Sequence, residues 1–105
     1  MTPIQILLVE DNPGDATLIA ELLGVDDRSF VLVHVDRLAL GLQRLKEDQF
    51  DAVLLDLRLP DATGLEAVRA IRAQTEDRQR WLLAGSLPYF LRELLKHWAE
   101  LEPDL

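Results

Sequence analysis

The stretch ILLVEDNPGD, residues 6–15, places an apolar run directly before two adjacent acids, Glu10 and Asp11, and then a turn sequence. A continuous apolar run bounded by turn-forming residues is typical of a strand covered on both faces in a parallel sheet. We therefore expect a strand over 4–9 that ends at the two acids. A second run, FDAVLLD at residues 50–56, also closes on an acid.

Between these runs the apolar residues recur at helical spacing, so strands and helices are expected to alternate. Strands are expected over 4–9, 30–34, 50–57 and 81–84, with helices over 15–23, 38–46 and 65–71. The helical residues expected to face the core are Ala16, Leu18, Ile19, Leu22, Leu23, Leu38, Leu42, Leu45, Leu65, Val68, Ala70 and Ile71. Alternation of this kind favours an α/β fold, a doubly wound parallel sheet with helices on both faces.

Three acids are expected to meet at one edge of this sheet. Glu10 and Asp11 follow the first strand and Asp56 ends the third, and ligands in such sheets bind beyond the carboxyl ends of the strands. Two carboxylates ~4 Å apart repel by roughly 4 kcal/mol at an effective dielectric constant near 20, so a gathered trio needs a cation or a proton. Oxygen ligands of this type suit Mg²⁺.

Composition narrows the classes of partner. The 105 residues include 11 basic and 19 acidic side chains, a formal net charge of −8, which repels phosphate backbones and anionic lipid, so we expect neither nucleic-acid nor membrane binding. There is no cysteine for a disulfide or a thiolate metal site. The apolar runs are far shorter than the ~20 residues of a membrane span, and the N-terminus lacks the pattern of a signal peptide. We expect a soluble, cytoplasmic protein of one domain.

Two motifs resemble the response-regulator receiver domain of two-component signalling. They are ILLVEDNPGD, with its acidic pair, and DAVLLDLRLPDATGLEAVRAIR at residues 51–72, in which Pro60 and Gly64 follow Asp56 by four and eight positions. The resemblance covers residues 4 to about 75. It implies the receiver, or flavodoxin-like, version of the doubly wound sheet.

The resemblance also implies roles for particular residues. Asp56 would be the phosphoacceptor, and Glu10, Asp11 and Asp56 would bind Mg²⁺ together with the backbone carbonyl of Arg58. The phosphodonor would be a histidine kinase or a phosphotransfer protein. No role is expected for His34 or for the second histidine of the chain.

The C-terminal quarter departs from the family. Receivers usually carry Ser or Thr at the end of strand four, where this chain has Ala84; Ser86 is a possible phosphate contact but is first a helix cap. The family's strand-five lysine, fifth strand and fifth helix are expected to be missing, with Lys96 a remote substitute for the lysine. We therefore expect four strands in the order 2-1-3-4.

The whole chain, 1–105, is expected to form one truncated receiver domain. Residues 4–80 would be its family-like core and 81–105 a divergent C-terminal strand and helix. Because the missing elements would leave apolar surface uncovered, the final helix is expected either to fold back over that face or to dock on a second copy. A homodimer through the C-terminal segment is the favoured outcome.

Three functions are compatible with these residues. The first is a stand-alone receiver, not an enzyme, that accepts a phosphoryl group on Asp56 and signals by protein contact. The second is a pseudo-receiver that acts in dimerisation or partner binding without efficient phosphorylation. The third is a Mg²⁺-dependent phosphatase with an aspartyl intermediate, which is weaker because such enzymes carry an acid two residues after the nucleophile, where this chain has Arg58.

Overall fold

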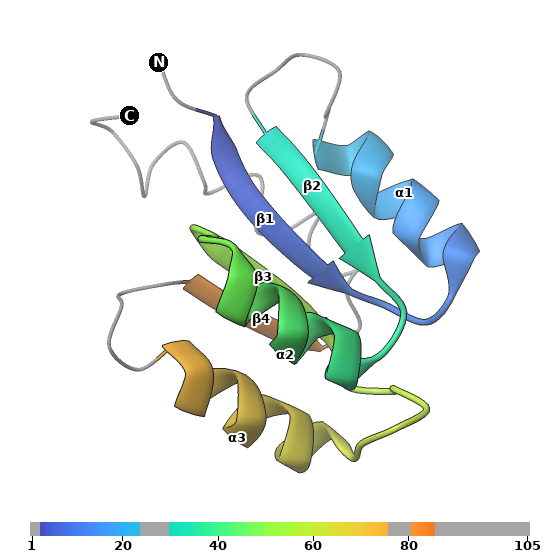
Figure 1. Ribbon diagram of the computed structural model, residues 1–105. Helices are drawn as coiled ribbons and strands as arrows, with labels where there is room; N and C mark the ends of the chain where they lie inside the picture. The colour runs from blue at the N-terminus through green and yellow to red at the C-terminus, as the bar shows by residue number, and fades with distance from the viewer. Residues whose placement is uncertain (1–2, 24–29, 76–80, 86–105) are drawn as a thin grey trace.

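In the computed structural model, four parallel strands alternate with three helices over the described residues, which are 3–23, 30–75 and, for the backbone alone, 81–85 (Figure 1). In chain order the elements are β1 (Ile4–Val9), α1 (Pro13–Leu23), β2 (Phe30–Val35), α2 (Leu38–Glu47), β3 (Ala52–Asp56), α3 (Gly64–Thr75) and β4 (Trp81–Gly85). The expected alternation of strands and helices is confirmed for these seven elements.

The strands form one sheet in the order β2-β1-β3-β4, which is the expected order. All three pairings are parallel, so all four carboxyl ends lie at the same edge of the sheet. Strand β1 is one of the two inner strands, and its side chains from Ile6 to Val9 are no more than 1% exposed. Coverage on both faces explains why this segment is apolar without alternation.

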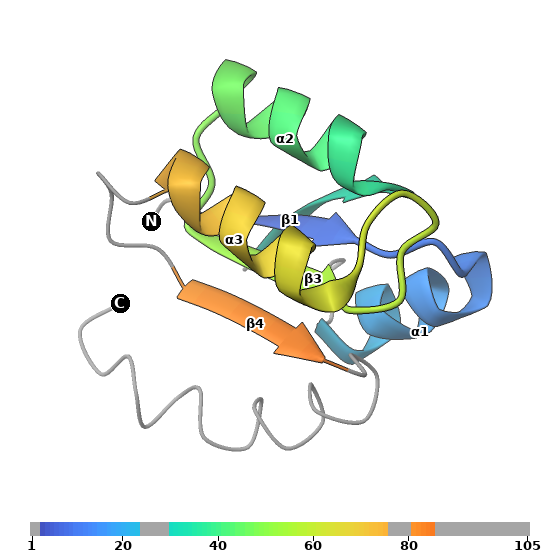
Figure 2. The same cartoon turned by 90° about the horizontal axis from the view of Figure 1, so that it is seen from below.

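Each face of the sheet has its own apolar core. Ile6, Leu8 and Leu54 pack against α1. Leu7, Val9 and other residues of the opposite face pack against α2 and α3. The helices therefore lie on both sides of the sheet, with α2 and α3 together on one side (Figure 2).

Two leucines expected in the core are exposed. Leu18 in α1 is 40% exposed and Leu65 in α3 is 62% exposed, so these two expectations are wrong. In α3 the fully buried positions are instead Ala67 and Ile71, four residues apart on the face toward the sheet. Leu65 lies two residues before Ala67, about 200° around the helix, so its side chain points away from the sheet.

The start of α1 also differs from the expectation. The helix begins at Pro13 and not at Asp15. Proline suits the first helical turn because its missing N–H has no partner there. Asn12 caps the helix, since its Oδ1 accepts a hydrogen bond from the Asp15 backbone N–H at 3.1 Å.

The predictions for residues 86–105 fall outside the described part of the chain. They concern the final helix, Ser86, Lys96, the missing fifth strand and helix, and the dimer contact. In the segments that are described, each helix is too short or too polar to cross a membrane.

Candidate functional site

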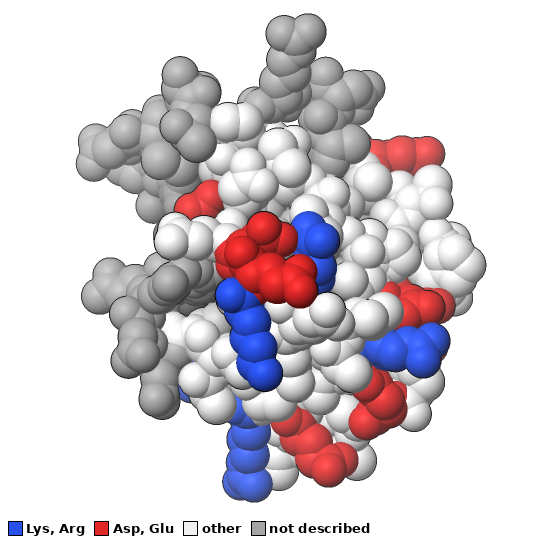
Figure 3. All heavy atoms as spheres, viewed as in Figure 1, with Lys and Arg blue, Asp and Glu red and all other residues white. Residues whose placement is uncertain are grey.

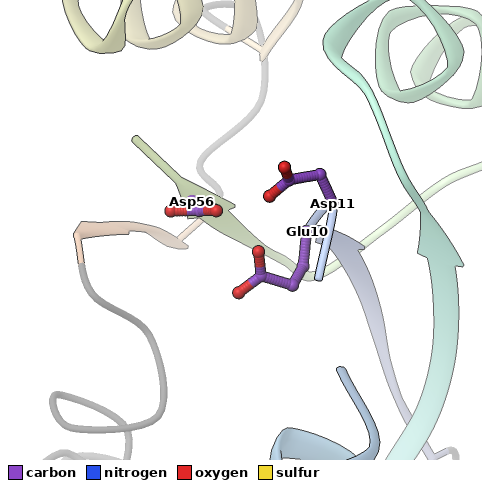
Figure 4. A group of neighbouring side chains, drawn as sticks. All are labelled: Glu10, Asp11 and Asp56. Atoms are coloured by element: carbon purple, nitrogen blue, oxygen red, sulfur yellow. The ribbon is translucent and has the colours of Figure 1, made fainter. Parts of the chain in front are cut away.

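The carboxyl ends of β1 and β3 bring the three predicted acids together. Glu10 and Asp11 follow β1 directly, and Asp56 is the last residue of β3, the strand paired with β1. One carboxylate oxygen from each residue lies within 4.8 Å of the others. In Figure 4 the three side chains point into a common space at the edge of the sheet. The predicted convergence of Glu10, Asp11 and Asp56 is confirmed.

The three acids differ in their access to solvent. Glu10 is 2% exposed and Asp56 is 9% exposed, whereas Asp11 is exposed. The cluster, called the pocket below, therefore has two largely buried acids as its floor and one acid that is exposed to solvent. Charges at the floor are poorly screened by water or salt, so they interact more strongly than a surface pair would.

Burial and the proximity of these acids change the pKa of Glu10. Burial of its side chain, a hydrogen bond with the Asp56 side chain and the negative charge of Asp56 raise its pKa from 4.5 to about 8. The backbone N–H of Asn12, 3.4 Å from Glu10 Oε2, opposes this rise but does not cancel it. Without a cation, the pocket relieves its repulsion by holding a proton on Glu10.

Strand β2 fixes the backbone of Glu10. The backbone N–H of Glu10 donates to the Val35 carbonyl at 3.0 Å. The carbonyl oxygen of Glu10 lies 2.7 Å from His34 Nε2. Because a carbonyl oxygen can only accept a hydrogen bond, Nε2 is the ring nitrogen that carries the hydrogen. No sequence pattern assigned a role to His34, but in the structure it supports the backbone of an acid of the pocket.

The loop after β3 is tied to the phosphoacceptor candidate. The backbone N–H of Arg58 donates to Asp56 Oδ1 at 3.0 Å, which orients that carboxylate. This contact places the Arg58 backbone next to the pocket, and the role of its carbonyl as a metal ligand stays a prediction. The same loop carries Asp61, whose contacts with α2 were not predicted from the sequence.

The donor set fits a divalent cation. It consists of carboxylate oxygens, which are hard ligands suited to Mg²⁺, and it includes an exposed acid that leaves room for water or a phosphate oxygen. The raised pKa of Glu10 indicates an excess of negative charge that a bound cation would neutralise. Glu10, Asp11 and Asp56 are thus the residues that could hold Mg²⁺, with the Arg58 carbonyl as a further predicted ligand.

Strand β4, which pairs with β3, has no hydroxyl side chain at the two positions that pair with Leu55 and Asp56. Asp56 pairs with Gly85, and Ala84 pairs with Leu55. Of the two residues, Ala84 was the one expected at the position of the family's Ser or Thr. Ser86, the suggested substitute, lies outside the described residues.

The charged side chains outside the pocket are mixed in sign. On the face seen in Figure 3, Lys and Arg side chains lie beside Asp and Glu and form no continuous basic area among the described residues. The expectation that nucleic acid is not a partner, made from the net charge of −8, stays a prediction.

Comparison with known sequences identifies the family. Residues 6–104 match the response regulator receiver domain, so the chain belongs to that family. One relative is the sensor protein GacS of Pseudomonas syringae pv. syringae, 32% identical over 84 residues, which are 80% of this chain and 9% of that protein. Another is protein-glutamate methylesterase/protein-glutamine glutaminase 2 of Koribacter versatilis, 36% identical over 70% of this chain and 21% of that protein. The chain thus matches only a small part of these relatives.

Solved structures agree with this assignment. The receiver domain of sensor histidine kinase PA1611 from Pseudomonas aeruginosa PAO1, which has a magnesium ion coordinated in its active-site cleft, is 34% identical with a TM-score of 0.67. The match covers 78% of this chain and 66% of that one. A CheY-like receiver domain from Methylobacillus flagellatus is 32% identical with a TM-score of 0.68, over 78% of this chain and 68% of that one.

Proposed function

We propose that this receiver domain accepts a phosphoryl group on Asp56 and passes the signal on through protein contact, without catalysing a reaction on a separate substrate. The observation that carries the proposal is the convergence of Glu10, Asp11 and Asp56 within 4.8 Å where two adjacent parallel strands end. We further propose that the domain acts in the cytoplasm.

The proposed donor is a phosphohistidine on a histidine kinase or a phosphotransfer protein. This donor class is supported by the relatives, several of which are sensor kinases, such as the autoinducer 2 sensor kinase/phosphatase LuxQ of Vibrio vulnificus. An Asp56 carboxylate oxygen attacks the phosphorus and forms a P–O bond as the P–N bond breaks. The electron pair of that bond stays on the imidazole nitrogen, which takes up a proton.

Mg²⁺ bound by Glu10, Asp11, Asp56 and the Arg58 carbonyl would neutralise charge on the transferring group. The residues of the chain itself prepare the nucleophile. The Arg58 N–H holds Asp56 Oδ1, so the carboxylate keeps one orientation. Glu10 beneath it is held at its backbone by Val35 and His34.

A pseudo-receiver without efficient phosphorylation is the second candidate. It is favoured by the register of β4, which places Gly85 opposite Asp56 and Ala84 one position before it. Neither residue offers a hydroxyl to a phosphoryl group, which brings about −1.5 to −2 charges. The phosphoryl group would then depend more on backbone N–H groups and the cation.

Intact-mass measurement separates these two functions. The protein is incubated with Mg²⁺ and a small-molecule phosphodonor, with Asp56→Asn and Asp51→Asn as paired variants. Asp51 precedes the other end of β3, and an Asn there can still accept the Gln5 N–H that Asp51 Oδ2 binds at 2.8 Å. A gain of one phosphoryl group in wild type and Asp51→Asn, absent in Asp56→Asn, supports the receiver. Metal binding without any mass gain supports the pseudo-receiver, and a gain that persists in Asp56→Asn refutes the assignment of Asp56.

A further inference from the structure

Asp61 caps a helix that belongs to a different part of the chain. Its Oδ1 accepts the backbone N–H of Leu38 at 2.9 Å, and its Oδ2 accepts that of Ala39 at 2.9 Å. Leu38 is the first residue of α2, and the residue before it, Arg37, makes no capping hydrogen bond with its own side chain. Two of the N–H groups that the first helical turn leaves without a partner are therefore satisfied by Asp61, 22 and 23 positions later in the chain.

The negative charge of Asp61 is favourable at the N-terminus of α2. Desolvation acts to raise its pKa, but the hydrogen bonds from Ala39 and Leu38, with smaller help from its own backbone and Arg37, hold the pKa below its ordinary value. Asp61 is therefore ionised at neutral pH. A negative charge at the N-terminus of a helix also interacts favourably with the helix dipole.

Asp61 lies in the short loop that begins at the pocket. Arg58 at the start of this loop is bonded to the Asp56 carboxylate. Leu59 and Ala62, on either side of Asp61, form an antiparallel bridge, and Pro60 between them has a fixed φ. These restraints connect Asp61 to Leu59, the residue that follows Arg58.

The far end of the loop is also anchored. The backbone N–H of Thr63 donates to Glu66 Oε1 at 3.0 Å, and the Glu66 N–H donates to Thr63 Oγ1 at 3.3 Å. This reciprocal pair is a capping box at the start of α3. The loop is thus held at the pocket, at α3 and, through Asp61, at α2.

We propose that Asp61 is a positioning residue for the cation pocket: by capping α2 it holds the loop so that the Arg58 carbonyl is available as a ligand. This inference rests on the proposed function, because it assumes that the pocket binds Mg²⁺. It assigns to Asp61 an effect on metal affinity beyond its effect on the stability of α2.

Calorimetric titration with Mg²⁺ tests this role in three variants of the full chain. Asp61→Ala removes both capping contacts, Asp61→Asn keeps one oxygen that can accept an N–H, and Ile19→Val weakens the core in α1 on the opposite face. We expect the Mg²⁺ dissociation constant to rise about tenfold in Asp61→Ala and less in Asp61→Asn, as for other losses of support around a metal ligand. In Ile19→Val it should stay within about twofold of wild type.

Hydrogen exchange in the wild type is a second test, and it does not depend on whether any variant folds. Because coupling is reciprocal, Mg²⁺ should slow hydrogen exchange at the Leu38 and Ala39 amides, measured by NMR, more than at Arg44 and Leu45 near the other end of α2. No difference between the two ends would overturn the proposal. So would a dissociation constant for Asp61→Ala equal to that of wild type.

The metal pocket and the role of Asp61 can be refuted separately. If the wild type binds no Mg²⁺, the proposed metal pocket is refuted and this inference falls with it. If the wild type binds Mg²⁺ but neither Asp61→Ala nor the α2 amides respond, only the role of Asp61 is refuted.

Discussion

Glu10 is an acid that the fold buries next to a second acid. Burial of a charge is costly unless a partner compensates it, and the raised pKa of Glu10 shows that the protein alone does not provide one. Arrangements that lower stability in this way are common at functional sites. The cation proposed above would supply the missing partner.

The pKa of Glu10 predicts how stability depends on pH when no divalent cation is present. The folded protein holds a proton on Glu10 up to about pH 8, whereas the unfolded chain releases it near its ordinary pKa of 4.5. The folded state therefore binds more protons between these values, and the free energy of unfolding should fall as pH rises from 5 to 8. The slope that one such proton contributes is at most about 1.4 kcal/mol per pH unit.

Urea denaturation in EDTA, at several pH values, measures this slope. Glu10→Gln removes the titrating group and should flatten the curve, so the difference between wild type and variant isolates the contribution of Glu10. Saturating Mg²⁺ should reverse the loss in wild type, because the cation competes with the proton. Equal slopes for the two proteins in EDTA would contradict the account.

The acids of the pocket could be predicted from the sequence, but their supports could not. Glu10, Asp11 and Asp56 follow apolar runs, and parallel strands bring their carboxyl ends to one edge. The contact of His34 with Glu10 depends on the register between β1 and β2, which no local pattern specifies. Asp61 resembles an ordinary turn residue in a Pro-containing loop, and its partners lie in another helix.

At the scale of elements, Gly41 sets how closely α2 approaches the sheet. A Cβ at this position would lie 3.0 Å from Val9 Cγ2 and 3.6 Å from Val35 Cγ2. Val9 is completely buried, so it has little room to move. The glycine is therefore required by packing and not by a turn.

Gly41→Ala should lower the free energy of unfolding. Alanine gains about 1 kcal/mol over glycine in a helix interior. Overpacking a buried contact costs about 1–3 kcal/mol, and because Val9 cannot move away we expect the cost to exceed the gain. The net loss should be roughly 1 kcal/mol, measured by urea denaturation.

A double-mutant cycle with Val9→Ala provides the control. Removing the Val9 methyl groups removes the closest contact, so Gly41→Ala should be neutral or stabilising in that background. If Gly41→Ala costs the same in both backgrounds, the close contact with Val9 is not the cause.

The sequence predicted which elements form better than it predicted where the helices begin and which helical residues are buried. Periodicity identified each helix, because amphipathic spacing reflects a sheet on one side. It did not identify the buried face of α3, because the small Ala67 is turned to the sheet and the larger Leu65 lies on the opposite side of the helix. Thr63 and Glu66 have the spacing of a capping box, a signal that marks the start of α3 in the sequence.

For the whole molecule, the homodimer remains a prediction. It concerns the C-terminal segment, whose apolar residues from 90 to 101 recur at helical spacing. Light scattering at several protein concentrations should give the mass of two chains at the higher ones. A mass of one chain throughout would rule out the dimer.

The central claim is that three carboxylates from two neighbouring strands form one cation site, and Mg²⁺ titration calorimetry tests it most directly. We predict one Mg²⁺ per chain in wild type and in Asp51→Asn. Binding should be at least about tenfold weaker in Asp11→Asn and Asp56→Asn, because each loses a charged ligand. Unchanged Mg²⁺ affinity in both of these variants, or no binding to the wild type, would contradict the account.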